Sequence, residues 1–335
     1  MTGDSQTPKN SIQDSQTPKN LKQDSQILGG AAENSRTAID FDDGVEFTGD
    51  FSQAGAPRTM FRDIVKRFAK NRLALVSLFV LLSIAMIAIL AGVISPYSPY
   101  TGDFTKIYEA PSAEHPFGCD ENGRDILSRL FYGARVSLTV GFVAVGISTS
   151  ISVVIGLFVA YYGKLLDTIM MRVLDMFMAF PSILFAIIMM SVFGKGLDKA
   201  ILAITIVGIP GSVRMVRATA MSAKETDYVQ AAKAIGCNDI VIMFKHILPN
   251  IMAPIIVGAT MSISGAILST AALGFLGLGM KPPTAEWGYM LSMGKEAIFV
   301  GPHLILFPGI AISITVLSFN LFGDGLRDAL DPRLK

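Results

Sequence analysis

Charged residues are scarce in this sequence. Aspartate, glutamate, lysine and arginine make up 16% of the 335 residues, whereas an average soluble domain carries about 25%. Apolar residues make up 51%, so the composition indicates an integral membrane protein. The formal net charge is only +1, which excludes the broad positive field that nucleic-acid binding requires.

Residue types that build catalytic and metal sites are also few. The three histidines, at positions 115, 246 and 303, are scattered without the spacing of a metal site. The two cysteines, Cys119 and Cys237, are predicted below to lie on opposite sides of the membrane, so we expect no disulfide between them. No Gly-x-x-x-x-Gly-Lys-Ser/Thr motif occurs, so the chain has no P-loop for ATP. We therefore expect no catalytic residue, no metal site and no cofactor on this chain.

The N-terminal residues 1–57 differ in composition from the rest. The sequence Asp-Ser-Gln-Thr-Pro-Lys-Asn at 4–10 recurs at 14–20, and a third copy begins at Asp24. The segment is polar and poor in aromatic residues, which predicts a disordered tail. It lacks the basic start and apolar core of a cleavable signal peptide. A partner-binding role stays open, but a dispensable tail is the favoured interpretation.

Long apolar runs follow the tail. A run needs about 20 residues to cross the hydrocarbon core of a bilayer. Six candidates meet or approach that length: 73–94, 137–161, 174–193, 200–213, 251–278 and 304–322. The fourth is the shortest and contains Pro210-Gly211. The sequence therefore predicts an all-α integral membrane protein with six transmembrane helices.

Lysine and arginine near the ends of these runs predict the orientation. Six basic residues lie between positions 58 and 72, directly before the first run, and others follow between 214 and 245. Cytoplasmic loops carry the excess of these residues. We therefore expect both termini in the cytoplasm, a first transmembrane helix with a basic flank at 58–95, and an external segment at 96–133.

The interiors of the runs hold almost no charge. Arg172 and Asp175 lie near one end of the third run, where interfacial hydrogen bonding is favoured over a transport role. A self-contained proton- or sodium-driven carrier would be expected to show more ionisable residues inside its spans. Prolines at 181, 210, 254 and 308 predict kinks in four of the runs.

The segment 226–250, between the fourth and fifth runs, fits neither a span nor a plain connector. Thr226 is the expected N-cap of a short helix, and Gly236 the expected bend after it. Asn238 is expected to cap a second short helix that Pro249 ends. One face of the first helix is predicted to carry Tyr228, Ala231, Ala232 and Ile235. One face of the second is predicted to carry Ile240, Phe244, Ile247 and Leu248.

Three environments are open to these short helices. An interfacial helix needs large apolar side chains, whereas the first helix offers mostly methyl groups, worth about 0.8 kcal/mol each. An isolated helix of about ten residues is marginal in water. A small-faced helix with one aromatic end suits a groove in a partner protein, because alanine lets backbones approach closely. The pattern favours docking to a protein.

The spacing within this segment has a specific counterpart. It runs Gln230-Ala231-Ala232, three residues, Gly236, nine residues, and His-Ile-Leu-Pro at 246–249. This resembles the EAA motif of ABC-importer permeases, which is Glu-Ala-Ala, three residues, Gly, nine residues and Ile-x-Leu-Pro. In that family the motif forms a coupling helix that enters a cleft of the ATPase subunit. Glutamine replaces the family's glutamate here, so an ion pair made through that glutamate does not carry over.

Further stretches resemble one subfamily, the dipeptide and oligopeptide importer permeases of the OppC/DppC type. The similarity covers about residues 60–335 and rests on 115–118, 120–129, 133–138, 276–279, 282–284, 286–288 and 323–333. It implies a type I importer permease fold whose core is spans two to six, with a transmembrane domain at 134–324 and a cytoplasmic C-terminus at 325–335. It also implies a multi-pass protein of a prokaryotic cell membrane.

The resemblance implies a function and a set of partners. The chain would be one permease subunit of a binding-protein-dependent importer of dipeptides or oligopeptides, without enzymatic activity of its own. A second permease, two ATP-binding subunits that hold ATP and magnesium, an external peptide-binding protein and membrane lipid would surround it. Import of nickel or another small solute stays an alternative, and a self-contained carrier is a weaker one.

Two groups of site residues follow from the resemblance. The residues expected to couple to the ATPase are Tyr228, Gln230, Ala231, Ala232, Gly236, Leu248 and Pro249. The residues expected to contact the binding protein are Asp120, Asn122, Arg124, Asp125 and Trp287.

Overall fold

The computed structural model describes residues 60–330, and the elements in that range are helical. The tail at 1–57 and the last five residues, on which predictions were made, lie outside the described residues. The elements are α2 (Met60–Lys70), α3 (Arg72–Ile94), the short η2 (Phe104–Lys106), α4 (Ile126–Tyr162), α5 (Lys164–Met178), α6 (Ser182–Phe193), α7 (Leu197–Lys224), α8 (Asp227–Ala234), α9 (Asp239–Val241), η3 (Ile242–Ile247), α10 (Leu248–Phe275), α11 (Trp287–Glu296) and α12 (His303–Leu330).

The predicted spans appear as five long helices and one bent pair. Helices α3, α4, α7 and α12, and the continuous stretch Asp239–Phe275, are each long and apolar enough to cross a membrane. At a rise of about 1.5 Å per residue, even α3 reaches roughly 35 Å, which exceeds the hydrocarbon core. The sixth candidate combines α5 and α6, whose axes differ by 83°.

The apolar run 174–193, which predicted one span, is therefore divided between two helices. Helix α5 ends at Met178 and α6 starts at Ser182, with Pro181, at φ −55° and ψ 129°, between them. Proline has no backbone N–H and pushes the residue before it out of the helical region, so the chain turns there. Pro210, Pro254 and Pro308 lie inside helices that continue through them.

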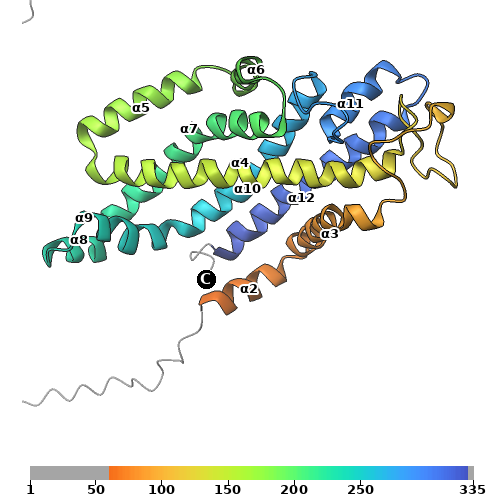
Figure 1. Cartoon of the computed structure of the whole chain (residues 1–335). Helices are drawn as coiled ribbons and strands as arrows, with labels where there is room; N and C mark the ends of the chain where they lie inside the picture. The colour runs from red at the N-terminus through yellow and green to blue at the C-terminus, as the bar shows by residue number, and fades with distance from the viewer. Residues whose placement is uncertain (1–59, 331–335) are drawn as a thin grey trace, which may run out of the picture. The chain divides into compact units, whose positions relative to one another are not determined.

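Helix α4 runs the length of the bundle and organises it (Figure 1). Its 37 residues correspond to about 55 Å. Small residues let α7 lie close along it: a Cβ built on Gly156 of α4 would be 2.8 Å from Cβ of Val216 on α7. Helix α4 starts at Ile126, within the segment 96–133 that is predicted to be external. The first turn of α4 carries the buried Arg129.

The basic flank before the first span is a separate helix, α2. Asn71 separates it from α3, and the Asn71 side chain accepts hydrogen bonds from the amides of Leu73 and Ala74. The ring of Phe68 on α2 meets Phe322 on α12 edge to face, with centroids 5.5 Å apart. The first and last described helices therefore pack together.

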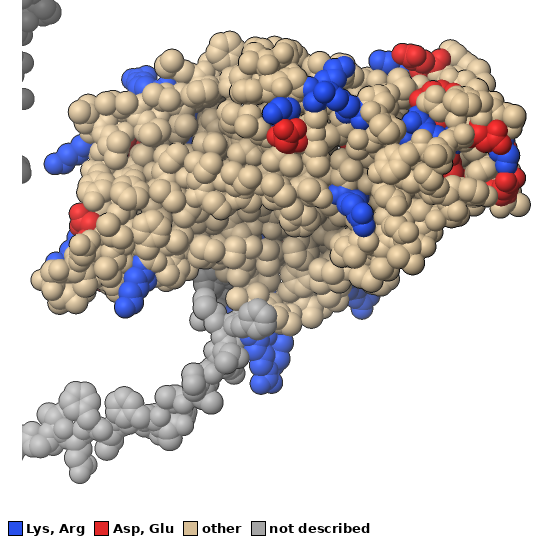
Figure 2. Space-filling model, viewed as in Figure 1, with Lys and Arg blue, Asp and Glu red and all other residues tan. Residues whose placement is uncertain are grey.

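Charge is distributed unevenly over the surface. In Figure 2 most of the visible face is uncharged, and the acidic side chains gather mainly at the end that carries α11 and the loop before α4. A broad uncharged band is what a chain exposes to lipid. Many large apolar side chains along the spans are also exposed, for example Phe79 on α3 and Leu317 on α12.

Candidate functional site

Helix α8 and the bend after it form a compact unit at one end of the bundle. Thr226 stands at the N-cap with an extended backbone, as the sequence predicts. Its hydroxyl donates to the carbonyl of Ala223 at 2.5 Å and does not cap α8. The turn from α7 into α8 is thus closed by a bond to the preceding helix.

Gly236 forms the predicted bend. Its φ is +78°, a conformation that glycine adopts without steric cost. The amide of Gly236 donates to the carbonyl of Lys233 at 3.0 Å, and the amide of Cys237 donates to the carbonyl of Ala232 at 3.1 Å. These two bonds make a Schellman motif, which satisfies the last carbonyls of α8. Asn238 then caps α9 by accepting from the amide of Ile240 at 2.9 Å.

The second short helix does not end at Pro249, and the prediction that it does is wrong. Helix α9 passes through the π-helical turn η3 directly into α10, and Pro249 lies in the first turn of α10. The amide of Leu248 donates to the carbonyl of Met243, five residues back. A proline ring normally clashes with the carbonyl four residues before it, and the wider π turn moves that carbonyl away. The chain after the Gly236 bend is thus one continuous helical stretch, Asp239–Phe275, that leads into α10.

The unit is anchored to α4 and α7 by a buried apolar cluster. Val229 and Ala232 point into it, with exposures of 0% and 4%, together with Leu157 of α4 and Val216 of α7. Ile242, Met243 and Ile247 of η3 complete the cluster. Such packing fixes the orientation of α8 relative to the two longest helices beside it.

Polar contacts tie the same junction. The hydroxyl of Tyr161, at the end of α4, donates to Oδ1 of Asp239 at 2.6 Å. Nζ of Lys224, at the end of α7, donates to the carbonyl of Tyr161 at 2.5 Å, and Nζ of Lys233 lies 5.3 Å from the centre of the Tyr161 ring. Tyr161 therefore links α4, α7, α8 and α9 at one point.

The outer face of α8 is exposed. Tyr228, Ala231 and Ile235 lie on it, and Ile235 is 79% exposed. The helical wheel placed Ala232 on this face too, which is wrong, because Ala232 follows Val229 by three residues on the opposite, buried stripe. The face predicted for the second helix also divides: Ile240 and Phe244 are exposed, whereas Ile247 is buried and Leu248 half-buried.

Two further predicted residues have defined places. Gln230 is exposed, and its side-chain amide donates to the carbonyl of Lys224 at 3.1 Å, which holds it against the end of α7. Pro249 is exposed. The exposed surface of this unit, called the α8 face below, is thus made of Tyr228, Gln230, Ala231, Ile235 and Ile240.

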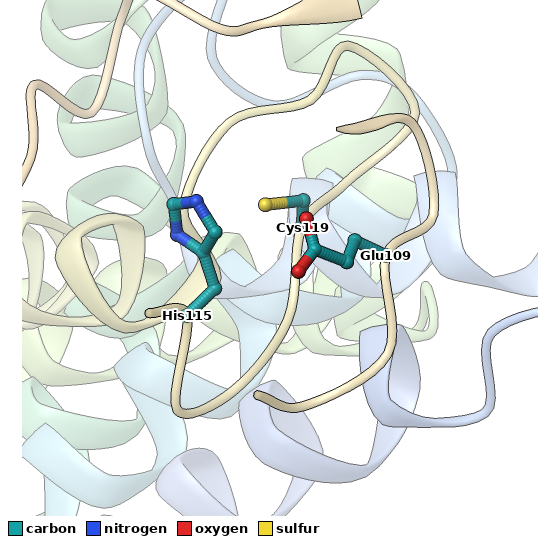
Figure 3. A group of neighbouring side chains, drawn as sticks. All are labelled: Glu109, His115 and Cys119. Atoms are coloured by element: carbon teal, nitrogen blue, oxygen red, sulfur yellow. The ribbon is translucent and has the colours of Figure 1, made fainter. Parts of the chain in front are cut away.

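The loop 95–125, at the other end of α4, holds a second group of polar side chains. Glu109, His115 and Cys119 each bring one ligand-type atom within 4.8 Å of the others (Figure 3). His115 and Cys119 are buried and Glu109 is half-buried. Burial raises the pKa of the Cys119 thiol to about 11, and the nearby Glu109 charge adds to this. The spacing of the histidines did not predict this group, although the sequence places His115 and Cys119 four residues apart.

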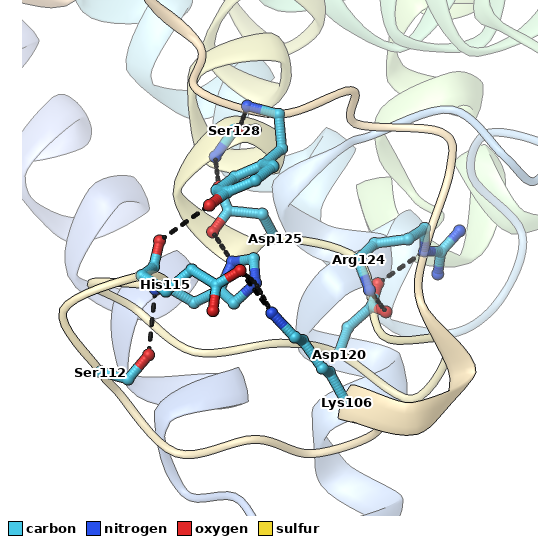
Figure 4. A network of polar contacts seen from close by, with 9 residues as sticks. Lys106, Ser112, His115, Asp120, Arg124, Asp125 and Ser128 are labelled. Atoms are coloured by element: carbon cyan, nitrogen blue, oxygen red, sulfur yellow. Dashed lines mark hydrogen bonds and ion pairs between the residues drawn. The ribbon is translucent and has the colours of Figure 1, made fainter.

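Three of the residues predicted to touch a binding protein, Asp120, Arg124 and Asp125, build the interior of this loop (Figure 4). Asp120 accepts from Nε of Arg124 at 2.7 Å and lies 3.3 Å from Nε of Arg129. Asp125 caps α4 by accepting from the amide of Ser128 at 2.8 Å, and Nδ1 of His115 lies 3.0 Å from its other oxygen. These side chains are buried and offer little surface to a partner, and their contact with a binding protein stays a prediction.

Asn122 and Trp287 complete that predicted set. Asn122 is half-buried and donates from its side chain to Glu121 at 2.9 Å. Trp287 is buried, and its indole N–H donates to the carbonyl of Leu130 on α4 at 3.0 Å. The ring fills the space over Gly133, where a Cβ would lie 2.6 Å from Trp287 Cδ1. Trp287 thus packs α11 onto α4.

Glu286, which was not among the predicted site residues, is fully buried. Its two oxygens accept from the amides of Gly288 and Tyr289, each at 2.7 Å, which caps α11. Burial raises the pKa of this carboxyl to about 7, although the two hydrogen bonds act in the opposite direction.

Comparisons with known proteins agree with this architecture. The family of binding-protein-dependent transport system inner membrane components matches residues 152–335, and the N-terminal TM domain of oligopeptide transport permease C matches residues 59–111. The inward-facing MetNI methionine ABC transporter shares the fold, with a TM-score of 0.51 at 20% identity, covering 62% of this chain and 98% of that one.

Curated relatives are similar over most of their length. The dipeptide transport system permease protein DppC of Alkalihalophilus pseudofirmus is 46% identical over 275 residues, which is 82% of this chain and 90% of the relative. DppC of Haemophilus influenzae is 44% identical and covers 84% of this chain and 97% of the relative. The glutathione transport system permease protein GsiD of Pectobacterium atrosepticum is 42% identical, covering 83% of this chain and 93% of the relative.

Proposed function

The chain belongs to the family of binding-protein-dependent transport system inner membrane components, and from this premise we propose that it is one of two permease subunits of an ABC importer for dipeptides or oligopeptides. The relatives named for dipeptide and glutathione transport support a peptide solute over nickel. Membership of this family also argues against the alternative of a self-contained carrier.

The observation that carries the coupling role is the α8 face. It is exposed, it is built of alanine between an aromatic and aliphatic side chains, and it stands on a buried anchor to α4 and α7. A small exposed helix face of this kind suits a groove of a partner. We assign this end of the bundle to the cytoplasm and the partner to an ATP-binding subunit, which holds ATP and magnesium.

The contacts around α8 suggest how motion would pass into the membrane. A displacement of α8 moves Asp239, and with it Tyr161 at the end of α4. The same displacement acts on α10, because α9, η3 and α10 follow one another without an interruption. Closure of the ATP-binding subunits would thus rotate α4 and α10 together. A second permease, facing this one, would complete the pathway, and an external binding protein would deliver the peptide.

Uptake by whole cells tests this function. Cells that lack the permease gene should lose accumulation of a labelled dipeptide or tripeptide, and the wild-type chain supplied in trans should restore it. Nickel accumulation should not change. Restoration of nickel uptake in place of peptide uptake would overturn the proposed solute while leaving the importer assignment intact.

Peptide binding measured on the isolated permease pair provides a second check. The spans offer few charges to hold a zwitterion, so affinity should reside mainly in the binding protein. Binding to the permease pair should therefore be weak without the binding protein. Tight binding at micromolar peptide would contradict this division of labour.

A further inference from the structure

Three residues of different chemistry meet in the loop 95–125. Figure 3 shows the sulfur of Cys119 directed toward the ring of His115, with the carboxylate of Glu109 beside it. The backbone holds them in register: the amide of Cys119 donates to the carbonyl of Glu109 at 3.0 Å, and the amide of Gly118 donates to the carbonyl of His115 at 2.9 Å. Main-chain bonds therefore fix the backbone that carries these three side chains.

His115 is oriented as metal-binding histidines are. Its Nδ1 lies 3.0 Å from Oδ1 of Asp125, a side chain that is itself fixed because it caps α4. With its proton on Nδ1 toward the carboxylate, the ring leaves the lone pair of Nε2 free for a cation. The ring of Tyr97, 4.6 Å away between centroids, holds the imidazole from one side.

Cys119 and Glu109 supply two further donors. The Cys119 side chain is fully buried. Within the described residues, the carboxylate of Glu109 makes no hydrogen bond or ion pair, although it is half-buried. A divalent cation bound between them would neutralise the carboxylate and take the place of the thiol proton, which would leave to solvent as the metal–thiolate bond forms.

From this geometry we infer that Glu109, His115 and Cys119 form a binding site for a divalent transition cation of the zinc class. The donors are a carboxylate oxygen of Glu109, Nε2 of His115 and Sγ of Cys119. Nitrogen and sulfur donors favour zinc over magnesium and calcium, which take oxygen ligands. The site does not depend on which solute the importer carries.

The distances suit such an ion after a small closure. In a tetrahedral site with Zn–N of about 2.0 Å and Zn–S of about 2.3 Å, ligand atoms lie roughly 3.5 Å apart. The three atoms already lie within 4.8 Å of one another, and the half-buried Glu109 side chain can move inward. Three protein ligands leave a fourth position for water or an external group.

Lys106 opposes the ion in the present arrangement. Its Nζ lies 3.5 Å from Nε2 of His115 and 2.5 Å from Oε1 of Glu114. Both Lys106 and Glu114 reach solvent, so the pair can turn outward when a cation binds. Removal of the lysine charge should therefore tighten binding, which a purely structural polar loop would not do.

Cobalt binding to the purified full-length permease with its partner subunits tests the site. After stripping with a chelator, the wild-type protein should bind one Co²⁺ per permease chain with a thiolate-to-cobalt absorption band, and Zn²⁺ should displace it. Cys119→Ser should abolish the band and weaken Zn²⁺ binding by more than about 100-fold, and Glu109→Gln by about tenfold. Lys106→Met should tighten binding.

The matched control is Cys237→Ser, which removes the other free cysteine of the described chain and should leave the band unchanged. Absence of bound cobalt in the wild type, or a band that survives Cys119→Ser, would overturn the inference.

Discussion

Replacement of Gly236 by valine should uncouple the permease from its ATP-binding subunits while leaving the membrane bundle intact. Gly236 has a φ of +78° and lies in open space, since a Cβ built there meets nothing within 4 Å. The cost of a side chain is therefore backbone strain and not a clash. A β-branched residue in this conformation costs on the order of 1–3 kcal/mol.

The strain falls on α8, which has only eight residues and is closed by the two bonds of its Schellman motif. A loss of 1–3 kcal/mol, taken as an order of magnitude, corresponds to roughly a 5- to 150-fold drop in the population with the α8 face correctly placed. Gly236→Val should reach normal levels in the membrane and retain the second permease. It should lose the ATP-binding subunits on purification, and peptide uptake should fall in proportion.

Two variants control this experiment. Gly236→Asn should be close to wild type, because asparagine tolerates the left-handed region. Gly277→Val imposes the same strain elsewhere: its φ is +74°, a Cβ there also meets open space, and the amides of Gly277 and Leu278 close the end of α10 in the same way. Gly277→Val should retain the ATP-binding subunits. If Gly236→Val co-purifies with them as the wild type does, the bend is not part of the coupling surface.

Three further changes have defined outcomes. Tyr161→Phe removes the 2.6 Å hydrogen bond to Asp239, which is worth about 1 kcal/mol. Transport should fall a few-fold while the ATP-binding subunits stay bound, and unchanged transport would count against transmission of motion through α4. Burial raises the pKa of Glu286 from 4.5 to about 7 in the folded chain. Protonation of Glu286 therefore adds to the free energy of unfolding fully below about pH 4.5, and this contribution is lost as the pH rises through 7. The loss is about 3 kcal/mol at most. Melting temperatures between pH 5 and 8 should therefore fall less steeply in Glu286→Gln than in the wild type, and parallel curves would refute the assignment. Deletion of residues 2–54, which lie outside the described chain, should leave insertion and uptake near normal, and lost uptake at normal protein levels would indicate a regulatory tail.

Much of the fold could be predicted because hydrophobic length and helix-terminal residues act locally. Apolar runs located the long helices, and Gly236 with Asn238 located the bend, since both residues act on the backbone beside them. A kink at Pro181 was predicted, but the full break of 83° was not, because the run around it carries no charge apart from Asp175 and reads as one continuous span.

Features set by tertiary contacts could not be predicted in this way. Helix α4 starts at Ile126, and the buried Arg129 in its first turn contacts Asp120 and the carbonyl of Pro99, which lies 30 residues earlier in the chain. The buried side of α8 is set by its packing with α4, α7 and η3, and a helical wheel drawn for α8 alone does not contain those contacts. The meeting of Glu109 with Cys119 depends on the path of an irregular loop.

The rate of thiol labelling beside the bend tests the central claim most directly. Natural Cys237 is half-buried at the bend, and Ile235→Cys would place a second thiol on the most exposed part of the α8 face. A reagent that reaches the cytoplasmic side should label both thiols readily in the permease pair alone and slowly when the ATP-binding subunits are bound. Labelling rates that ignore those subunits would show that this face is not where the transporter couples to ATP.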